Sequence, residues 1–363
     1  MLSIPIPADS IFNMTTDHTS ASPSVLVNGD NIIVQVRELA VQFNTMQGAV
    51  SAVNGVSFDV PAGKTLGIVG ESGCGKSVTA QSILRLLPSP PARILNGEIL
   101  FQRRNGEVID LAKLQPKSPE MRSIRGNEIA MIFQEPMTSL TPAYTVGEHI
   151  MEAVKLHQGV EKREAKKRAV EMLDRVGMPQ PSRTVDAYPH QLSGGMLQRA
   201  MIAIALSCRP TLLIADEPTT ALDVTTGAQI LDLMERLQAE LGMSIIHISH
   251  NLGVIAEVAD EVAVMYLGRI VEQATVEELF GNPKHPYTQG LLKSLPLVGV
   301  KRRLEPIQGV VPEPNAIPPG CAFGPRCPKF MPGKCDASIP PAFQVGPAHT
   351  TRCFLYEESS AGK

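Results

Sequence analysis

The chain has 363 residues and a mass of 39.1 kDa, which suggests about two domains, and its 43% hydrophobic content is enough for a sizeable core. The formal net charge of −3 gives no general reason to expect a nucleic acid partner, and no secretory signal is recognisable, so we expect a cytosolic protein. No apolar run approaches the roughly 18 residues needed to cross a bilayer, so we expect any membrane-spanning parts to lie in other chains.

The N-terminal region divides into an irregular segment and a β-rich one. Residues 1–29 mix Ser, Thr, Pro and Asp without periodicity, which predicts a disordered leader, with Met14 as an alternative start. Further on, short runs rich in β-branched residues alternate with turn residues, a pattern that favours strands. We expect an antiparallel sheet that leads into the next segment. The predicted strands cover residues 33–36, 39–43 and 56–60, and the turn at 61–63 follows them.

A glycine-rich loop lies between a predicted strand, 65–69, and a predicted helix, 78–87. Its pattern is Gly-x-x-x-x-Gly-Lys-Ser, in which glycines let several N–H groups point at one phosphate and the helix presents its positive end to the same anion. Lys76 would reach the β- and γ-phosphates, and the Ser77 hydroxyl would bind Mg²⁺. The alternative is a turn without a ligand, which the flanking strand and helix disfavour. The predicted nucleotide-binding residues of the loop are Gly70, Glu71, Ser72, Gly73, Cys74, Gly75, Lys76 and Ser77.

The middle of the chain alternates between strands and helices. A proline-rich break at 88–91 ends the loop helix, and Gln134 directly follows the second of the next two predicted strands. Apolar residues at helical spacing then predict two helices, so we expect a helical insertion over about 135–208. The predicted strands are 97–101 and 129–133, and the predicted helices are 146–157 and 161–176.

Two carboxylates end a further apolar strand, 211–217. Parallel strands present their carboxyl ends at one edge of a sheet, which is also where the glycine-rich loop lies. Asp216 would therefore hold Mg²⁺ and Glu217 would polarise an attacking water. Two solvated acids at a strand end are the alternative. His250 follows another apolar strand, 244–249, and is either a γ-phosphate contact or an ordinary surface histidine.

The stretch Gln191–Arg199, with the sequence Gln-Leu-Ser-Gly-Gly-Met-Leu-Gln-Arg, resembles the signature of the ABC-type ATPases. A serine and two glycines before a helix make physical sense as a second anion cradle. The resemblance implies that Ser193, Gly194 and Gly195 bind the γ-phosphate of ATP held by another subunit, so that two ATP molecules lie in a head-to-tail dimer. Met196 stands where glutamine is commoner in the family.

The resemblance covers about residues 32–280 and assigns further roles. Phe43 is similar to the aromatic residue that stacks on adenine, although a core phenylalanine is the alternative. Gln134 resembles the glutamine that contacts Mg²⁺ and signals to the membrane partner, and Asp223 resembles the acid at the dimer seam. His250 resembles the switch histidine, with Asn251 in place of the usual aspartate.

Two stretches narrow the resemblance to the ATPases of dipeptide and oligopeptide importers. They are 133–142 and 282–288, and the second opens the C-terminal extension of that group. Nickel, glutathione and opine importers belong to the same group, so a peptide is the favoured solute and these other solutes remain alternatives. The resemblance implies two membrane permease subunits, an extracytoplasmic solute-binding protein, a second ATPase subunit that is a related but different chain, and a place at the cytoplasmic face of the inner membrane.

Four of the six cysteines lie in the proline-rich tail, with 5, 7 and 17 residues between successive ones. In a reducing compartment such clustering indicates metal ligation rather than disulfides. Zinc sites usually contain a close Cys-x₂₋₄-Cys pair, which is missing, and the resemblance implies a [4Fe–4S] cluster; zinc and metal-free thiols remain alternatives. The predicted ligands are Cys321, Cys327, Cys335 and Cys353.

We therefore expect an α/β P-loop ABC-type ATPase domain over 30–280, with an antiparallel β subdomain and a helical subdomain, and a Cys-rich C-terminal extension over 281–363. ATP hydrolysis with Mg²⁺ would drive solute import. An ABC ATPase that acts on DNA or the ribosome is a second class, disfavoured because the chain has one cassette and no sustained heptads. A scaffold with a dead site is a third, disfavoured because the motif residues are intact.

Overall fold

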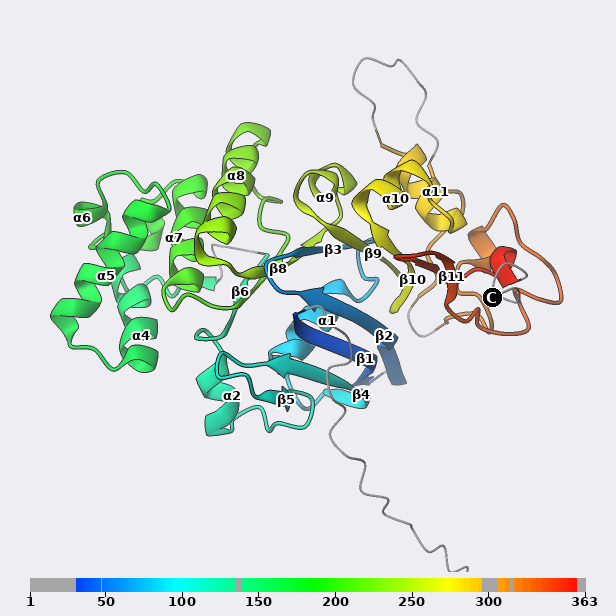
Figure 1. The fold of residues 1–363 in the computed structure, drawn as a ribbon, viewed down its shortest axis with the longest axis horizontal. Coiled ribbons are helices and arrows are strands. Elements are labelled where there is room, and N and C mark those ends of the chain that lie inside the picture. The colour runs from blue at the N-terminus through cyan, green and yellow to red at the C-terminus, as the bar shows by residue number, and fades with distance from the viewer. Residues whose placement is uncertain (1–30, 47, 135–138, 296–305, 314–315, 358–363) are drawn as a thin grey trace, which may run out of the picture.

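The computed structural model describes residues 31–46, 48–134, 139–295, 306–313 and 316–357, so the expected leader over 1–29 lies outside the described residues. This part of the chain contains two sheets, and helices pack on and beside the larger one (Figure 1). In the described residues no helix is long and apolar enough to cross a membrane.

The smaller sheet is antiparallel, as expected, and its strand order is β2-β1-β4-β5. The predicted strands 33–36 and 39–43 form one long strand, β1. Between Val36 and Leu39 the register of β1 against β2 shifts, and Glu38 takes a positive φ of 45° there. A bulge of this kind bends and twists a strand without ending it. The strands are β1 (Ile32–Thr45), β2 (Gly48–Pro61), β4 (Ala92–Gln102) and β5 (Val108–Asp110).

The larger sheet has the order β11-β12-β10-β9-β3-β8-β7-β6. Its strands from β9 to β6 are parallel, and β10, β12 and β11 add an antiparallel end. The predicted apolar strands before the glycine-rich loop and before the two carboxylates both lie in the parallel part. The strands are β3 (Thr65–Val69), β6 (Ile129–Ile132), β7 (Leu212–Asp216), β8 (Ser244–Ser249), β9 (Glu261–Tyr266), β10 (Arg269–Thr275), β11 (Phe343–Gly346) and β12 (His349–Thr351).

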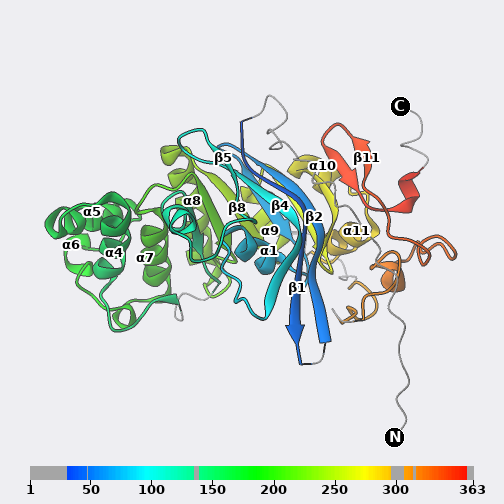
Figure 2. The same cartoon turned by 90° about the horizontal axis from the view of Figure 1, so that it is seen from below.

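Alternate residues of the parallel strands enter different cores. Ile68 and Ile214 join one core with the antiparallel sheet and α1 (Lys76–Ile83), whereas Leu213 packs with α7 (Gly194–Leu206) and α8 (Val224–Leu241) on the other face. The two views in Figures 1 and 2 show these layers. Burial on both faces explains why these strands are continuously apolar rather than alternating. The short helix α2 (Pro119–Ile124) also contributes to the first core, and α9 (Leu252–Val258) covers β3.

A group of helices projects from the β6 and β7 end of the sheet (Figure 1). The first, α4 (Val146–Gln158), begins with a reciprocal capping box between Thr145 and Glu148 and ends at Gly159, which takes a left-handed conformation. Apolar residues of these helices form one core with the sheet. The others are α5 (Lys162–Arg175), α6 (Pro181–Thr184), a 3-10 turn η1 (Pro189–Gln191) and α7.

The C-terminal segment adds β11 and β12 to the edge of the large sheet. The fully buried carboxylate of Glu272 on β10 accepts hydrogen bonds from the backbone N–H groups of Lys284 (2.6 Å) and His285 (2.8 Å), and its Oε1 lies 2.7 Å from Nε2 of His349. The single carboxylate of Glu272 therefore connects β10 with the residues before α11 and with His349 of the C-terminal tail. The segment contains α10 (Val276–Gly281), α11 (Pro286–Lys293) and the 3-10 turns η2 (Gly324–Arg326) and η3 (Phe354–Tyr356).

Candidate nucleotide site

The glycine-rich loop connects β3 to α1 at the carboxyl edge of the parallel sheet. Two of its glycines are required by space as well as by conformation. Gly70 and Gly75 have φ values of +155° and +103°, and a Cβ there would lie 2.2 Å from the carbonyl oxygen of Met265 and 2.4 Å from that of Ala52. The two glycines thus let the loop pack directly against β9 and β2 at the N-terminal end of α1, where a phosphate could bind.

Lys76 is buried at the first position of α1, and its ammonium group lies inside the loop. Nζ donates hydrogen bonds to the carbonyl oxygens of Gly70 (2.7 Å) and Glu71 (3.2 Å). The amine is therefore held at the loop mouth, where a phosphate oxygen could exchange with these carbonyls as its partner.

Asp216 ends β7 directly beside the loop. It is 3% exposed, and burial raises the pKa of its carboxyl group, while a hydrogen bond with the Ser77 side chain opposes that rise. Its Oδ1 has no hydrogen-bond partner among the described residues. A buried, unsatisfied carboxylate oxygen next to a hydroxyl fits Mg²⁺, which prefers oxygen ligands and keeps part of its water shell.

Three side chains, from the loops that follow β6, β7 and β8, converge on one oxygen of Glu217. Its Oε2 accepts hydrogen bonds from Nε2 of Gln134 (3.0 Å) and the hydroxyl of Thr220 (2.9 Å), and Nδ1 of His250 lies 3.1 Å from it. The Glu217 backbone has a left-handed φ of 49° and its N–H donates to Ile248 on the neighbouring strand (3.0 Å). This sparsely populated conformation aims the carboxylate at the group.

The structure thus brings together Gln134, Glu217 and His250, which the sequence placed at three separate strand ends. It also adds Thr220, which sequence reasoning missed. The only signal was its position three residues after the strand-end acid, since a hydroxyl there can turn back onto the carboxylate.

The predicted signature residues lie at the start of α7, and Asp223 is the N-cap of α8. Ser193 caps α7 by accepting from the N–H of Met196 (3.4 Å), and Asp223 accepts from the N–H of Thr226 (3.0 Å). A Cβ on Gly195 would lie 2.8 Å from Cγ2 of Thr226, so the two helix starts touch. In the described part of the chain no hydrogen bond joins this pair of helix starts to loop residues 70–77. Ser193, Gly194 and Asp223 are exposed there, and Gly195 is half-buried.

Phe43 lies near the end of β1, paired with Val50 on β2 and with Ala92 on β4. It is half-buried and packs against the core of the antiparallel sheet. Part of the ring is therefore open to solvent, as stacking on a base requires, and part of it belongs to the core.

The expectation of a metal cluster in the tail is not supported. Across the residues that the structure describes, no group of three or more His, Cys, Asp or Glu side chains is arranged to hold a metal ion. Cys321 and Cys335 are joined through their backbones, N–H to carbonyl at 2.7 Å. Burial raises the pKa of Cys321, of Cys327 and, to about 11, of Cys353.

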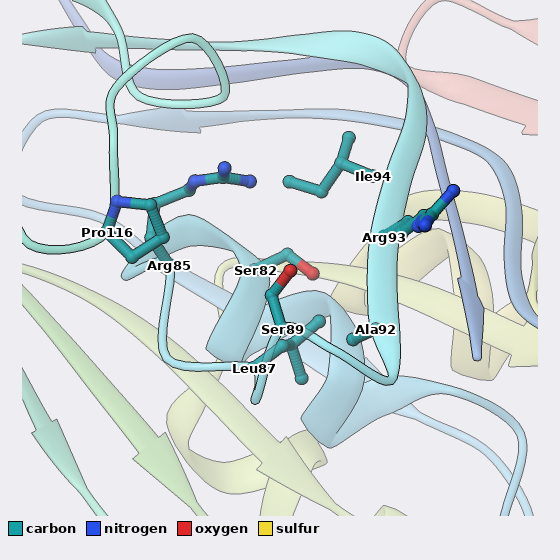
Figure 3. Close-up of a pocket in the computed structure, with 8 residues that line it drawn as sticks. All are labelled: Ser82, Arg85, Leu87, Ser89, Ala92, Arg93, Ile94 and Pro116. Carbon is teal, nitrogen blue, oxygen red and sulfur yellow. The ribbon is translucent and has the colours of Figure 1, made fainter. Parts of the chain in front are cut away.

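A pocket shown in Figure 3 lies at the other end of α1 from the loop. Arg85 on its wall donates from Nε to the carbonyl of Leu114 (3.2 Å), and burial lowers the pKa of its guanidinium. No predicted site residue lines this pocket, so we assign it no part in nucleotide binding. Its lining residues are Ser82, Arg85, Leu87, Ser89, Ala92, Arg93, Ile94 and Pro116.

Comparison with known proteins identifies the family. The ABC transporter family model matches residues 53–220. A putative peptide import ATP-binding protein of Brucella melitensis is 52% identical to the chain over 91% of its length and 98% of that protein. The chain belongs to the ABC transporter family. The oligopeptide transport ATP-binding protein AppD of Bacillus subtilis is 49% identical to this ABC ATPase, over 91% of its length and 98% of AppD. A model named oligopeptide/dipeptide transporter, C-terminal region, matches residues 271–335.

Solved structures share the fold of this ABC ATPase. A dimeric ATP-binding cassette, MJ0796, in a post-hydrolysis state with ADP and Pi, has a TM-score of 0.58 and 27% identity over 67% of this chain and 99% of that one. The protein cbiO1 of Clostridium perfringens, part of an ABC transporter complex, has a TM-score of 0.55 and 28% identity over 70% of this chain and 92% of that one. The expected ABC-type ATPase fold is therefore confirmed.

Proposed function

We propose that this ABC ATPase hydrolyses ATP to power the import of di- or oligopeptides through a membrane complex. The proposal is supported by relatives about half identical to the chain that are named for peptide import or for dipeptide or oligopeptide transport. It is also supported by the match of the C-terminal region to a family of that name.

The observation that carries the catalytic part is the convergence of Gln134, Thr220 and His250 on Oε2 of Glu217. In the proposed site Glu217 accepts hydrogen bonding from the attacking water and orients it in line with the γ-phosphate. With ATP bound, His250 and Gln134 would move away from the Glu217 carboxylate and contact the phosphate side of the site. Phosphoryl transfer requires positioning and charge compensation above all, which this arrangement of side chains supplies.

Nucleotide binding is assigned to the glycine-rich loop. Lys76 would exchange its two carbonyl partners for phosphate oxygens, and the loop N–H groups would bind the same anion. Ser77 and Asp216 would hold Mg²⁺, which neutralises phosphate charge when bound, with Gln134 near it. Phe43 would stack on the adenine.

The second half of a working site would come from another subunit. Ser193, Gly194, Gly195 and Asp223 gather at one exposed pair of helix starts, suited to reach the γ-phosphate bound by a partner. We propose a related but different ATPase chain as that partner, two permease subunits and an extracytoplasmic binding protein, with this chain at the cytoplasmic face of the inner membrane. The division into an ATPase domain over 30–280 with a helical subdomain and an extension over 281–363 is part of the same proposal.

The four-cysteine segment keeps one sequence-based proposal, a [4Fe–4S] cluster, although the arrangement of the thiols does not support it. Anaerobic purification followed by iron and sulfide analysis tests it directly. A content of about four iron atoms per chain that is lost in a Cys327→Ser variant would support the cluster. Iron-free protein with normal ATPase activity would exclude it.

The main experiment measures ATP hydrolysis by the full complex in proteoliposomes, with dipeptides, oligopeptides, glutathione or Ni²⁺ supplied with the binding protein. Stimulation by peptides identifies peptides as the substrate class. Stimulation by glutathione or Ni²⁺ alone would assign the chain to a different group of importers. A Glu217→Gln variant serves as the control, because it should bind ATP and turn over about 100- to 1,000-fold more slowly. Unchanged turnover in this variant would refute the role of Glu217.

A further inference from the structure

The C-terminal segment reaches back to the phosphate loop. Arg326, in the 3-10 turn η2, lies 255 residues after Glu71 and donates two hydrogen bonds to its carboxylate, from NH1 to Oε2 at 2.7 Å and from NH2 to Oε1 at 3.1 Å. The Arg326 side chain is 4% exposed and that of Glu71 is 28% exposed. A paired guanidinium and carboxylate in this fork geometry is among the stronger side-chain contacts.

Arg326 is itself held in place on its remaining sides. Its Nε donates to the carbonyl of Gln308 (3.2 Å) and NH1 also donates to the hydroxyl of Tyr266 (3.3 Å). The guanidinium lies 5.8 Å from the ring centroid of Tyr266 and 5.9 Å from that of Phe323. Contacts other than the one with Glu71 therefore also hold the guanidinium in place.

A second side chain of the same segment, that of Tyr287, forms a hydrogen bond with the backbone of Glu71. The hydroxyl of Tyr287, at the start of α11, accepts a hydrogen bond from the Glu71 N–H at 3.0 Å. Tyr287 is fully buried, and its ring packs on Tyr266 and Phe323 with centroids 4.7 and 5.3 Å away. The Glu71 carbonyl in turn accepts from Lys76 (3.2 Å). Side chain, N–H and carbonyl of Glu71 thus each have a partner.

The charge of Glu71 gives this arrangement a consequence for binding. A carboxylate in a phosphate loop repels the anion that the loop is built to hold. Arg326 compensates that charge by pairing with the carboxylate, while Tyr287 holds the Gly70–Glu71 peptide, whose Gly70 carbonyl accepts a hydrogen bond from the Lys76 amine.

We propose that Arg326 and Tyr287 are positioning residues for ATP binding, through which the C-terminal segment sets the affinity of the phosphate loop for nucleotide. The proposal deepens the proposed function and rests on the assignment of loop 70–77 as the ATP site. It makes the segment around η2 a regulatory element, because any change that moves Arg326 alters the charge at the loop.

The test measures the dissociation constant for MgATP on the full chain with a fluorescent ATP analogue, and KM against kcat in the assembled complex. Arg326→Gln should weaken binding about tenfold and raise KM with little change in kcat, since it leaves the Glu71 charge uncompensated. Arg326→Lys should lie between wild type and Arg326→Gln, because it keeps the charge and loses the fork. Tyr287→Phe, which keeps the ring, should weaken binding about threefold.

The deciding variant is Arg326→Gln combined with Glu71→Gln. Removal of the carboxylate should restore most of the lost affinity, to within about threefold of wild type. A purely structural role of Arg326 would not be rescued in this way, so a double variant as weak as Arg326→Gln would overturn the proposal. The matched control is Arg352→Gln, an arginine of the same segment whose N–H donates to Val271 and whose side chain makes no hydrogen bond to the loop in the described structure. Its affinity should equal that of wild type.

Melting temperatures without nucleotide separate misfolding from the proposed effect. If Arg326→Gln fails to fold, Glu71→Gln and Tyr287→Phe still test the contact from its other sides, and wild-type affinity in Tyr287→Phe would count against it. Because coupling is reciprocal, MgATP should also slow amide hydrogen exchange in 320–327 in the wild type and less in Arg326→Gln. If the wild-type chain does not bind ATP at all, the assignment of the nucleotide site is refuted. If wild type and Arg326→Gln bind ATP equally well, the nucleotide site stands and the role of Arg326 is refuted.

Discussion

His247 lies in the middle of β8, the strand that ends just before His250, and the structure gives it an unusual position for a titratable group. The residue is 2% exposed, and neither ring nitrogen has a hydrogen-bond partner among the described residues. Its neighbours on the parallel ladder are Gly67 and Ala215, so nothing across the strands compensates a charge. Burial lowers the pKa of His247 from 6.5 to about 4.

This shift ties stability to pH in a defined direction. Between about pH 6.5 and pH 4 the unfolded chain binds a proton at His247 and the folded chain does not, so the free energy of unfolding falls as the pH falls. The full difference of the two pKa values corresponds to about 3 kcal/mol, reached at pH 4 and below, and absent above pH 7. His285, whose pKa burial also lowers to about 4, contributes in the same window.

The substitution His247→Leu isolates the effect, because leucine has a similar volume and does not titrate. At pH 7.5 the variant should be as stable as wild type or about 1 kcal/mol more stable, since two unsatisfied nitrogens are removed. At pH 4.5 it should exceed wild type by about 2–3 kcal/mol. Urea unfolding followed by circular dichroism at several pH values measures both. Equal loss of stability on acidification in the two proteins would refute the reasoning.

Two further predictions concern the site. Thr220→Val removes one hydrogen bond to Glu217 and should lower kcat about tenfold with ATP affinity unchanged; steady-state kinetics and nucleotide binding check this, and unchanged kcat would show that Gln134 and His250 suffice. Gly75→Ala places a Cβ 2.4 Å from the carbonyl of Ala52 at a φ of +103°, so it should abolish nucleotide binding with a lowered melting temperature. Gly63→Ala, which shares the strain of a positive φ (+71°) but has open space at its Cβ, should retain binding.

Much of the site could be predicted because its parts are local. The loop 70–77 has a strand before it and a helix after it, and the acids of β7 follow an apolar run, so spacing alone assigns them to the edge of one sheet. The two predicted strands that are a single β1 mark the limit of this reasoning, since a bulge at Glu38 has no reliable sequence pattern.

The C-terminal segment could not be predicted in the same way. Cysteine spacing indicated ligands for a metal, yet whether four thiols meet at one point depends on how the turns around them pack, and no metal-binding group of side chains forms among the described residues. Nor does any local pattern show that Glu272 connects the tail to the large sheet, because its partners lie up to 77 residues away.

Short segments of the chain were enough to predict the chemistry they carry: an anion-binding loop with its lysine and serine, two strand-end acids, a second glycine cradle, and the order in which they occur. Which of these groups meet could be seen only in the folded chain. It joined Gln134, Thr220 and His250 on one oxygen of Glu217, and it placed Arg326 on Glu71. The physical reason is that a local pattern follows from backbone propensity and periodicity, whereas a contact between residues 255 apart exists only once strand order and core packing have fixed both ends.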